Sequence, residues 1–393
     1  MEPIGAFMEL AANRPRLPAL TSLRFFAALH VVIFHLYSMH VTEGPAWYRN
    51  LSSIGYVGVS LFFVLSGFIL VYTYAGRAWT AVTFWQARIA RIYPAYLFSL
   101  LITAPSFLYA CVVLKNVNIP FYTWFKAHLL VSWTLPPLLL QSWVPHAALA
   151  WNTPAWSLSD EAFFYAIFPL LAAWLLRTSG RKLMTLAFLA WLVSLSFSSG
   201  YAIFKPDGIT RVDDQSLNLF WLDAVKFHPL ARMPEFLVGV YLGFLFLRNP
   251  LDRKWGTLLV FCGVSIFAVV VVFSPHVPYT ILHDSLLTPA FGAIIYGLAL
   301  RPSWVRVFEL KPLQLLGDAS YSLYLLHSLM VAIYFDPYQN MHHQSLVGIL
   351  VGIAIMMGVS ILAYLFIEQP ARQWLRPKEK RQLPIATEAA KAW

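Results

Sequence analysis

Charged residues and cysteines are both scarce in this sequence. Charged residues make up 12% of its 393 residues, whereas a soluble globular protein has about 25%. The two cysteines, Cys111 and Cys262, both lie inside apolar runs. The scarcity of charge argues against a soluble domain, and the two isolated cysteines exclude a disulfide framework or a zinc site built on cysteine.

Apolar and aromatic residues replace the missing charge. Hydrophobic residues make up 59% of the chain, aromatic residues 16%, and the mean hydropathy is +0.64. This composition is typical of a protein that crosses a lipid bilayer many times. The net charge of +10 comes from Lys and Arg gathered between the apolar runs, which is the pattern of the positive-inside rule. We therefore expect the lipid bilayer, and no nucleic acid, as a partner.

A membrane-spanning helix needs about 20 residues, and ten apolar segments of the chain have this length. With ten spans, the basic connectors all lie on one side of the membrane and both termini lie in the cytoplasm. The sequence therefore predicts an all-α integral membrane protein with about ten transmembrane helices in one bundle. The expected spans are 22–41, 54–75, 92–114, 155–176, 183–199, 229–247, 255–273, 284–300, 318–335 and 345–367.

One apolar stretch does not fit this scheme. Residues 121–150 are interrupted by three prolines, and as a full span they would invert every later connector. We expect a re-entrant or interfacial segment on the outer side, since irregular backbone is tolerated there only against protein or a cavity. One transmembrane domain is thus expected over 1–375, followed by a charged, disordered cytoplasmic tail over 376–393.

The first span contains ionisable residues, which are costly inside a membrane. Arg24 and His35 are eleven residues apart, which is close to three full helical turns and about 16 Å along the axis. They therefore share one face, with Arg24 at the cytoplasmic mouth and His35 at depth. The alternatives are a snorkelling cation and a packing histidine. His30 faces elsewhere, and we interpret His30 and His40 as packing residues.

The second and third spans add a hydroxyl and two arginines. Ser66 either lines a cavity or bonds its own helix backbone. Arg88 and Arg91 are three residues apart, so they share a helix face at the membrane level of Arg24. They are either a positive-inside pair or, with Arg24, a clamp for phosphate groups, for which the guanidinium fork is well suited.

The fourth span contributes a carboxylate. Ser157 and Glu161 are four residues apart on one helix face, and we expect Ser157 to line the cavity. Glu161 enters from the outer side and can approach the depth of His35, so the two residues form a plausible acid–base couple. Asp160 points elsewhere, and we expect it at the membrane interface.

Three later positions complete the set of polar residues within apolar runs. Arg232 and Glu235 are three residues apart, which indicates an internal ion pair; the alternative is that both line the cavity. His327 either packs or lines the cavity. Glu368 is interpreted as structural. No group of residues has the spacing of metal ligands, so no metal is expected.

The order of these motifs resembles that of the acyltransferase-3 family, the bacterial inner-membrane O-acyltransferases of O-antigen, exopolysaccharide and Nod-factor type. The matching features are Arg-x10-His at Arg24 and His35, "LFFVLSGFIL", Arg-x-x-Arg at Arg88 and Arg91, "WSLSDE" ending at Glu161, "RMPEFLVG", "YSLYLLH" and "IEQPAR". Each motif is weak alone, but together they run the length of the chain.

The resemblance implies a reaction and its substrates. The donor would be acyl-CoA, most commonly acetyl-CoA, used as a co-substrate with no permanently bound cofactor. The acceptor would be a hydroxyl of a saccharide or lipid-linked glycan. The arginines would bind the donor. His35 would act as the base or carry the acyl group, with Glu161 fixing its tautomer or stabilising its charged form.

Two other classes of protein remain open. Intramembrane Glu, His and Arg also mark the pathways of transporters, and the broken segment 121–150 is compatible with a discontinuous transport helix. A scaffold for glycan assembly would use the same residues for packing only. Acyl transfer that depends on His35 would distinguish the enzyme from both.

Overall fold

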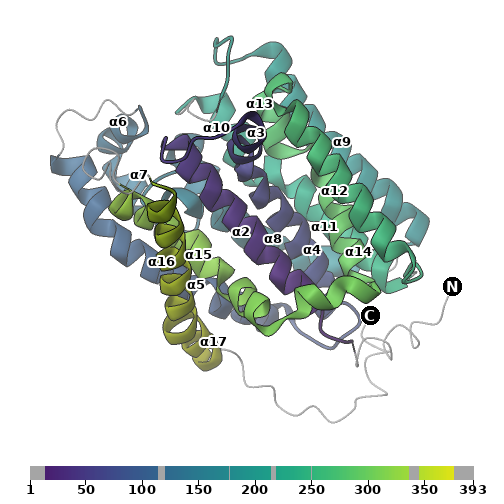
Figure 1. Ribbon diagram of the computed structural model, residues 1–393. Coiled ribbons are helices and arrows are strands. Elements are labelled where there is room, and N and C mark those ends of the chain that lie inside the picture. The colour runs from purple at the N-terminus through teal and green to yellow at the C-terminus, as the bar shows by residue number, and fades with distance from the viewer. Residues whose placement is uncertain are drawn as a thin grey trace.

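The computed structural model describes residues 14–113, 120–176, 178–213, 218–248, 250–335 and 345–375, and every element within them is helical (Figure 1). The expected tail 376–393 lies outside the described residues. The main helices are α2 (Pro18–Ser38), α3 (Ala46–Ser53), α4 (Gly58–Tyr74), α5 (Ala81–Leu108), α8 (Trp156–Leu175), α9 (Gly180–Phe204), α10 (Phe220–Phe227), α11 (Pro229–Arg248), α12 (Trp255–Phe273), α13 (Tyr279–Asp284), α14 (Thr288–Ala299), α15 (Lys311–Tyr334), α16 (Leu346–Ala363) and α17 (Gln369–Leu375).

Nine helical segments of the described chain are long and apolar enough to cross a membrane. The prediction of an all-α, multi-pass membrane protein is therefore confirmed. Short 3-10 or π turns extend several of these segments beyond the helices named above. The nine segments are Pro18–Ser38, Gly55–Tyr74, Ala81–Cys111, Thr153–Leu175, Gly180–Phe204, Phe220–Arg248, Trp255–His276, Tyr279–Ala299 and Leu346–Leu375.

The remaining expected span, 318–335, corresponds to α15. This helix has 24 residues but is less apolar than the nine. It begins at Lys311, seven residues before the expected start, with a proline in its first turn. Asp318 therefore lies within the helix instead of at its end. Because α15 packs along α2 and α16, its polar side chains can face protein instead of lipid.

The segment 121–150 does not form a spanning helix, as expected. It folds into α6 (Pro120–Ala127) and α7 (Leu129–Thr134), followed by three 3-10 turns between 136 and 147. Its irregular backbone packs on the beginning of α8, where Gln141 donates to the carbonyl of Ala155 at 2.9 Å and Ser142 to that of Trp156 at 2.7 Å. Contact with protein makes such a backbone tolerable at this depth.

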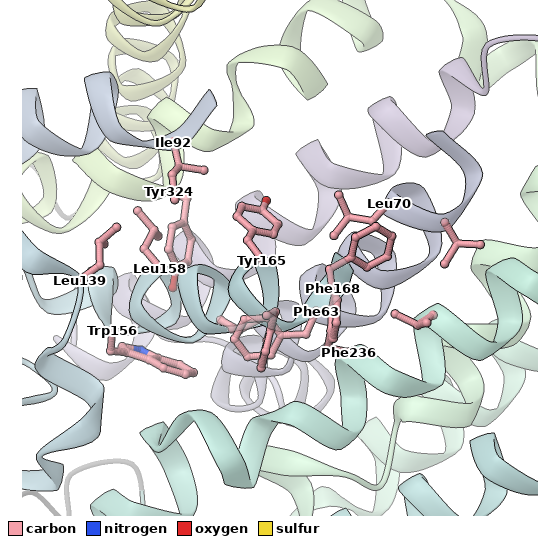
Figure 2. Packing of buried hydrophobic residues seen from close by; sticks show 14 of the residues in the cluster. Phe63, Leu70, Ile92, Leu139, Trp156, Leu158, Tyr165, Phe168, Phe236 and Tyr324 are labelled. Atoms are coloured by element: carbon pink, nitrogen blue, oxygen red, sulfur yellow. The ribbon is translucent and has the colours of Figure 1, made fainter. Parts of the chain in front are cut away.

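The long helices run side by side in a bundle (Figure 1). α2 packs along α15 and α4, α11 packs against α4 and α9, and α12 packs against α14. The contact between α4 and α11 is backbone to backbone, because a Cβ atom at Gly239 would lie 2.0 Å from the carbonyl oxygen of Val64. Figure 2 shows aromatic side chains, including Phe63, Trp156 and Phe236, filling the space between the helices.

One end of the bundle gathers most of the basic connectors, and we call it the basic end. There Arg14 donates to the carbonyls of Tyr72 and Ala75 at 2.6 and 2.7 Å, joining the start of α2 to the end of α4. Partial burial and the neighbouring Arg77 lower the pKa of Arg14 to about 10, which leaves it charged at neutral pH. Described basic residues at this end include Arg14, Arg16, Arg77, Arg181, Lys182, Arg248, Arg253, Lys254, Arg301, Arg306 and Lys311.

Candidate active site

Two histidines from different helices face each other away from the basic end. His35 lies near the end of α2 and His327 lies in the second half of α15. Their ring centroids are 4.8 Å apart, with 43° between the ring planes. His327 is fully buried, whereas His35 is half-buried. The structure thus gives His35 an imidazole neighbour, and places His327 in direct contact with the predicted reactive residue.

The hydrogen bonds of His327 define which of its nitrogens is protonated. Its Nδ1 lies 2.7 Å from the carbonyl oxygen of Tyr324, which can only accept, so Nδ1 donates. Nε2 therefore bears the lone pair of the neutral ring, and it has no hydrogen-bond partner among the described residues. Ser157, predicted to line the cavity, lies 2.8 Å from the Tyr324 hydroxyl and is buried. Ser157 thus holds the tyrosine that orients His327.

Arginines gather nearer the basic end. Arg91 lies 3.7 Å from the Glu368 carboxylate, and Arg24 interacts electrostatically with Arg91. Arg88 donates to the Tyr74 hydroxyl at 2.9 Å and lies over the ring of that tyrosine. Tyr165 interacts with all three arginines. The structure therefore brings together Arg24, Arg88 and Arg91, the residues that the sequence assigned to one membrane level.

Glu161 belongs to this arginine cluster. Its Oε1 accepts hydrogen bonds from Ser66 at 3.2 Å and from Tyr165, and its charge acts on Arg24. The Ser66 hydroxyl thus bonds a site carboxylate. The titratable residue that interacts electrostatically with His35 is His327, and no hydrogen bond or ion pair joins His35 and Glu161 among the described residues. The predicted acid–base couple of these two residues stays a prediction.

The cluster also contains carboxylates that the sequence analysis did not assign to it. Asp318 interacts electrostatically with both Arg24 and Arg91, although it was the first residue of the expected span 318–335. Glu368 is buried and accepts from Ser322 at 3.0 Å, so its structural interpretation agrees with its contacts. Three guanidiniums and three carboxylates thus lie in the same region of the bundle. The charge of one group offsets that of another, which makes the burial of this cluster tolerable.

A second charged cluster lies on α11, α13 and α4. Arg232 forms an ion pair with Glu235 at 2.9 Å, with both side chains fully buried, so the expected internal ion pair is confirmed. Arg232 also pairs with Asp284 and donates to Ser60 Oγ at 2.9 Å and to the His283 carbonyl at 3.2 Å. Asp284 and His283 were not predicted from the sequence, because a contact between separate helices leaves no local spacing pattern.

The predictions for Asp160 and His40 are wrong. Asp160 is fully buried and interacts electrostatically with Arg232, instead of lying at the interface. The reason is that residues 136–155 cover the start of α8. His40 lies beyond the end of α2, exposed and with φ of 56°, so it is no packing residue. His30 does pack, with Nε2 2.8 Å from the Leu51 carbonyl.

The arrangement offers two kinds of chemistry at two depths. The histidine pair provides an unpartnered imidazole nitrogen for proton transfer or nucleophilic attack. The arginine cluster provides guanidinium groups that suit phosphates. Among the described residues, no group of three or more His, Cys, Asp or Glu has the geometry to hold a metal ion.

Comparison with known sequences gives consistent results. Residues 17–365 match the family model described as "Acyltransferase domain". The chain is 30% identical over 330 residues to acyltransferase MdmB of Streptomyces mycarofaciens, covering 80% of this chain and 79% of that protein. It is 25% identical over 386 residues to O-acetyltransferase OatA of Staphylococcus aureus, covering 91% of this chain and 57% of OatA. No solved structure matches.

Proposed function

This chain belongs to the acyltransferase-domain family, and from that premise we propose that it transfers an acyl group from acyl-CoA to a saccharide hydroxyl. The acyl group would be acetyl, and the acceptor a glycan or lipid-linked saccharide. The observation that carries the proposal is the placement of Arg24 and His35 on one helix, with an arginine cluster around one and an imidazole pair around the other. The protein would lie in the bacterial inner membrane.

The orientation of the bundle supports a cytoplasmic donor. Arg14, Arg181 and Arg248 lie at the basic end, and the positive-inside rule assigns such an end to the cytoplasm. Both termini would then be cytoplasmic, as the distribution of basic connectors in the sequence predicts. The histidine pair lies beyond the arginine cluster on the way to the opposite face.

The arginine cluster would bind the phosphates of coenzyme A. Arg24 and Arg91 are half-buried, Arg91 pairs with Glu368, and Arg24 interacts electrostatically with Glu161 and Asp318, so an entering phosphate would replace one anionic neighbour by another. His35 lies about 16 Å further along α2, at 1.5 Å per residue. This offset is of the order of the pantetheine arm, which would place the thioester beside the histidine pair.

In the proposed reaction His35 acts as general base. Its unprotonated ring nitrogen takes the proton of the acceptor hydroxyl, and the hydroxyl oxygen attacks the thioester carbonyl. The carbon–sulfur bond then breaks, and the coenzyme A thiolate takes the proton from the imidazolium. The products are an ester and a free thiol. In the variant reaction His35 itself attacks, and an acyl-imidazole forms before the acceptor arrives.

The test measures acylation in cells that lack the native chromosomal copy. Cells expressing the wild type, His35→Ala or His30→Ala would be compared by mass spectrometry of their surface glycans and small glycosides. We expect acyl groups with the wild type and His30→Ala, and none with His35→Ala, at equal amounts of folded protein. Acylation that persists in His35→Ala would overturn the role of His35. Solute flux into vesicles without acyl-CoA would favour the transporter.

The two variants of the mechanism differ in one observable. Purified wild-type protein would be incubated with labelled acetyl-CoA and no acceptor. Label retained on the peptide containing His35 supports the acyl-enzyme variant. Its absence, together with transfer once an acceptor extract is added, supports direct attack. His30→Ala serves as the control, because His30 lies on the same helix and bonds the Leu51 carbonyl.

A further inference from the structure

His327 is oriented by a hydrogen bond to its own helix. Its Nδ1 donates to the carbonyl oxygen of Tyr324 at 2.7 Å, one turn earlier on α15. The hydroxyl of Tyr324 in turn lies 2.8 Å from both Ser157 Oγ and the Pro154 carbonyl. Asn152 donates to the next carbonyl on α15, that of Leu325, at 3.0 Å. The segment 152–157, which leads into α8, therefore holds the part of α15 that orients this imidazole.

The free nitrogen of His327 is the second observation. Because Nδ1 donates, Nε2 can only accept. It is buried without a hydrogen-bond partner among the described residues, although an unpaired buried acceptor is costly. The ring of His35 lies beside it, with centroids 4.8 Å apart. At that separation, ring nitrogens of the two imidazoles can approach to hydrogen-bond distance after a small rotation.

We propose that His327 is the positioning residue for His35, with its Nε2 accepting the N–H of the His35 ring. That bond would fix His35 in one tautomer and leave its other nitrogen unprotonated toward the reacting hydroxyl. An acceptor on one nitrogen makes the opposite nitrogen of the same imidazole a better base, as the acidic residue does in a catalytic triad. The inference rests on the proposed function and assigns to His327 the role that the sequence suggested for Glu161.

The surroundings of Glu161 support this assignment. The carboxylate of Glu161 accepts from Ser66 and Tyr165 and acts on Arg24, so its interactions lie within the arginine cluster. His327, in contrast, is the titratable group that acts on His35. The proton balance of the reaction is unchanged, because the shared N–H stays between the two rings while the other nitrogen of His35 takes and returns the proton.

The test measures the reactivity of the His35 ring directly. Purified protein in lipid nanodiscs would be treated with diethyl pyrocarbonate, and the rate of carbethoxylation at His35 followed by peptide mass spectrometry. His327→Phe keeps an aromatic ring but has no acceptor, whereas His327→Gln restores one. We expect His327→Phe to slow the reaction at His35 by about tenfold, the effect of one hydrogen bond, and His327→Gln to recover most of the rate. The rate at His30 provides the internal control.

Kinetics of acyl transfer give the second readout. In His327→Phe the kcat should fall while the KM for acetyl-CoA stays at the wild-type value, because the donor phosphates bind elsewhere. His327→Met, which is also apolar but flexible, replaces His327→Phe if the latter lowers the melting temperature. A wild-type carbethoxylation rate in folded His327→Phe, or a failure of folded His327→Gln to recover, would overturn the inference.

If the proposed function is wrong, the results differ from those expected when the pairing of His327 with His35 is wrong. Carbethoxylation needs neither acyl-CoA nor an acceptor, so it reports on the two rings alone. A slowed reaction at His35 in His327→Phe, combined with unchanged acyl transfer, would support the pairing of the rings and overturn the role of His35 in the reaction.

Discussion

Gly317 on α15 lies directly against the backbone of Thr21 on α2. A Cβ atom at Gly317 would be 2.1 Å from the carbonyl oxygen of Thr21, which is closer than non-bonded atoms can approach. α2 and α15 therefore touch backbone to backbone near the basic end. The same two helices carry His35 and His327 further along. This contact thus sets the distance between the helices on which the candidate active site is built.

Gly317→Ala is expected to lower both stability and activity. Helix propensity alone would favour alanine by about 1 kcal/mol, but the clash must push α15 away from α2, at a cost of about 1–3 kcal/mol. The melting temperature and the rate of acyl transfer should both fall. Gly358→Ala on α16 is the matched control, since nothing lies within 4 Å of a Cβ there. Equal behaviour of the two variants would contradict the argument.

Glu161→Gln separates the two roles considered for Glu161. If its carboxylate organises the arginine cluster, the KM for acetyl-CoA should rise by about tenfold, since hydrogen bonds to charged groups are worth about 1.5–3 kcal/mol. The kcat should change little. Steady-state kinetics at saturating acceptor measure both constants. A loss of kcat with an unchanged KM would instead support the predicted acid–base couple of Glu161 and His35.

Arg91→Gln is expected to weaken donor binding. The variant removes one guanidinium from the cluster and leaves the buried Glu368 without the charge 3.7 Å away. The KM for acetyl-CoA should rise by about tenfold or more, with a smaller effect on dephospho-CoA thioesters, which lack one phosphate. Arg181→Gln is the control for an arginine whose charge serves only to orient the protein in the membrane, because Arg181 is exposed at the same end. Equal effects of the two substitutions would show that Arg91 has no special place in donor binding.

Arg232→Met is expected to destabilise the fold without acting on the chemistry. Removing the guanidinium leaves Glu235 and Asp284 buried without their partner, which costs about 3–5 kcal/mol. The melting temperature should fall sharply, and the double variant Arg232→Met, Glu235→Met should recover part of the loss. Arg253→Met, on an exposed connector, should leave stability unchanged. A melting temperature at the wild-type value in Arg232→Met would contradict a structural role for the pair.

The sequence by itself determined the class of the fold and the register within single helices. Runs of apolar residues about 20 long predict spanning helices because only a helix satisfies its own backbone in lipid. The helical repeat likewise places Arg24 and His35 on one face, since that relation is internal to α2. The ion pair of Arg232 and Glu235 was predictable for the same reason, being three residues apart on one helix.

Only the tertiary structure decided which helix faces meet. His327 lies against His35, Glu161 turns to Ser66 and Tyr165, and Asp160 is buried beside Arg232. The periodicity of one helix defines its own faces, but says nothing about the rotation or height of the neighbour that packs on each. Those depend on contacts such as Gly317 with Thr21, and on the irregular segment that covers the start of α8. The partners of the intramembrane polar residues are therefore set by packing between helices.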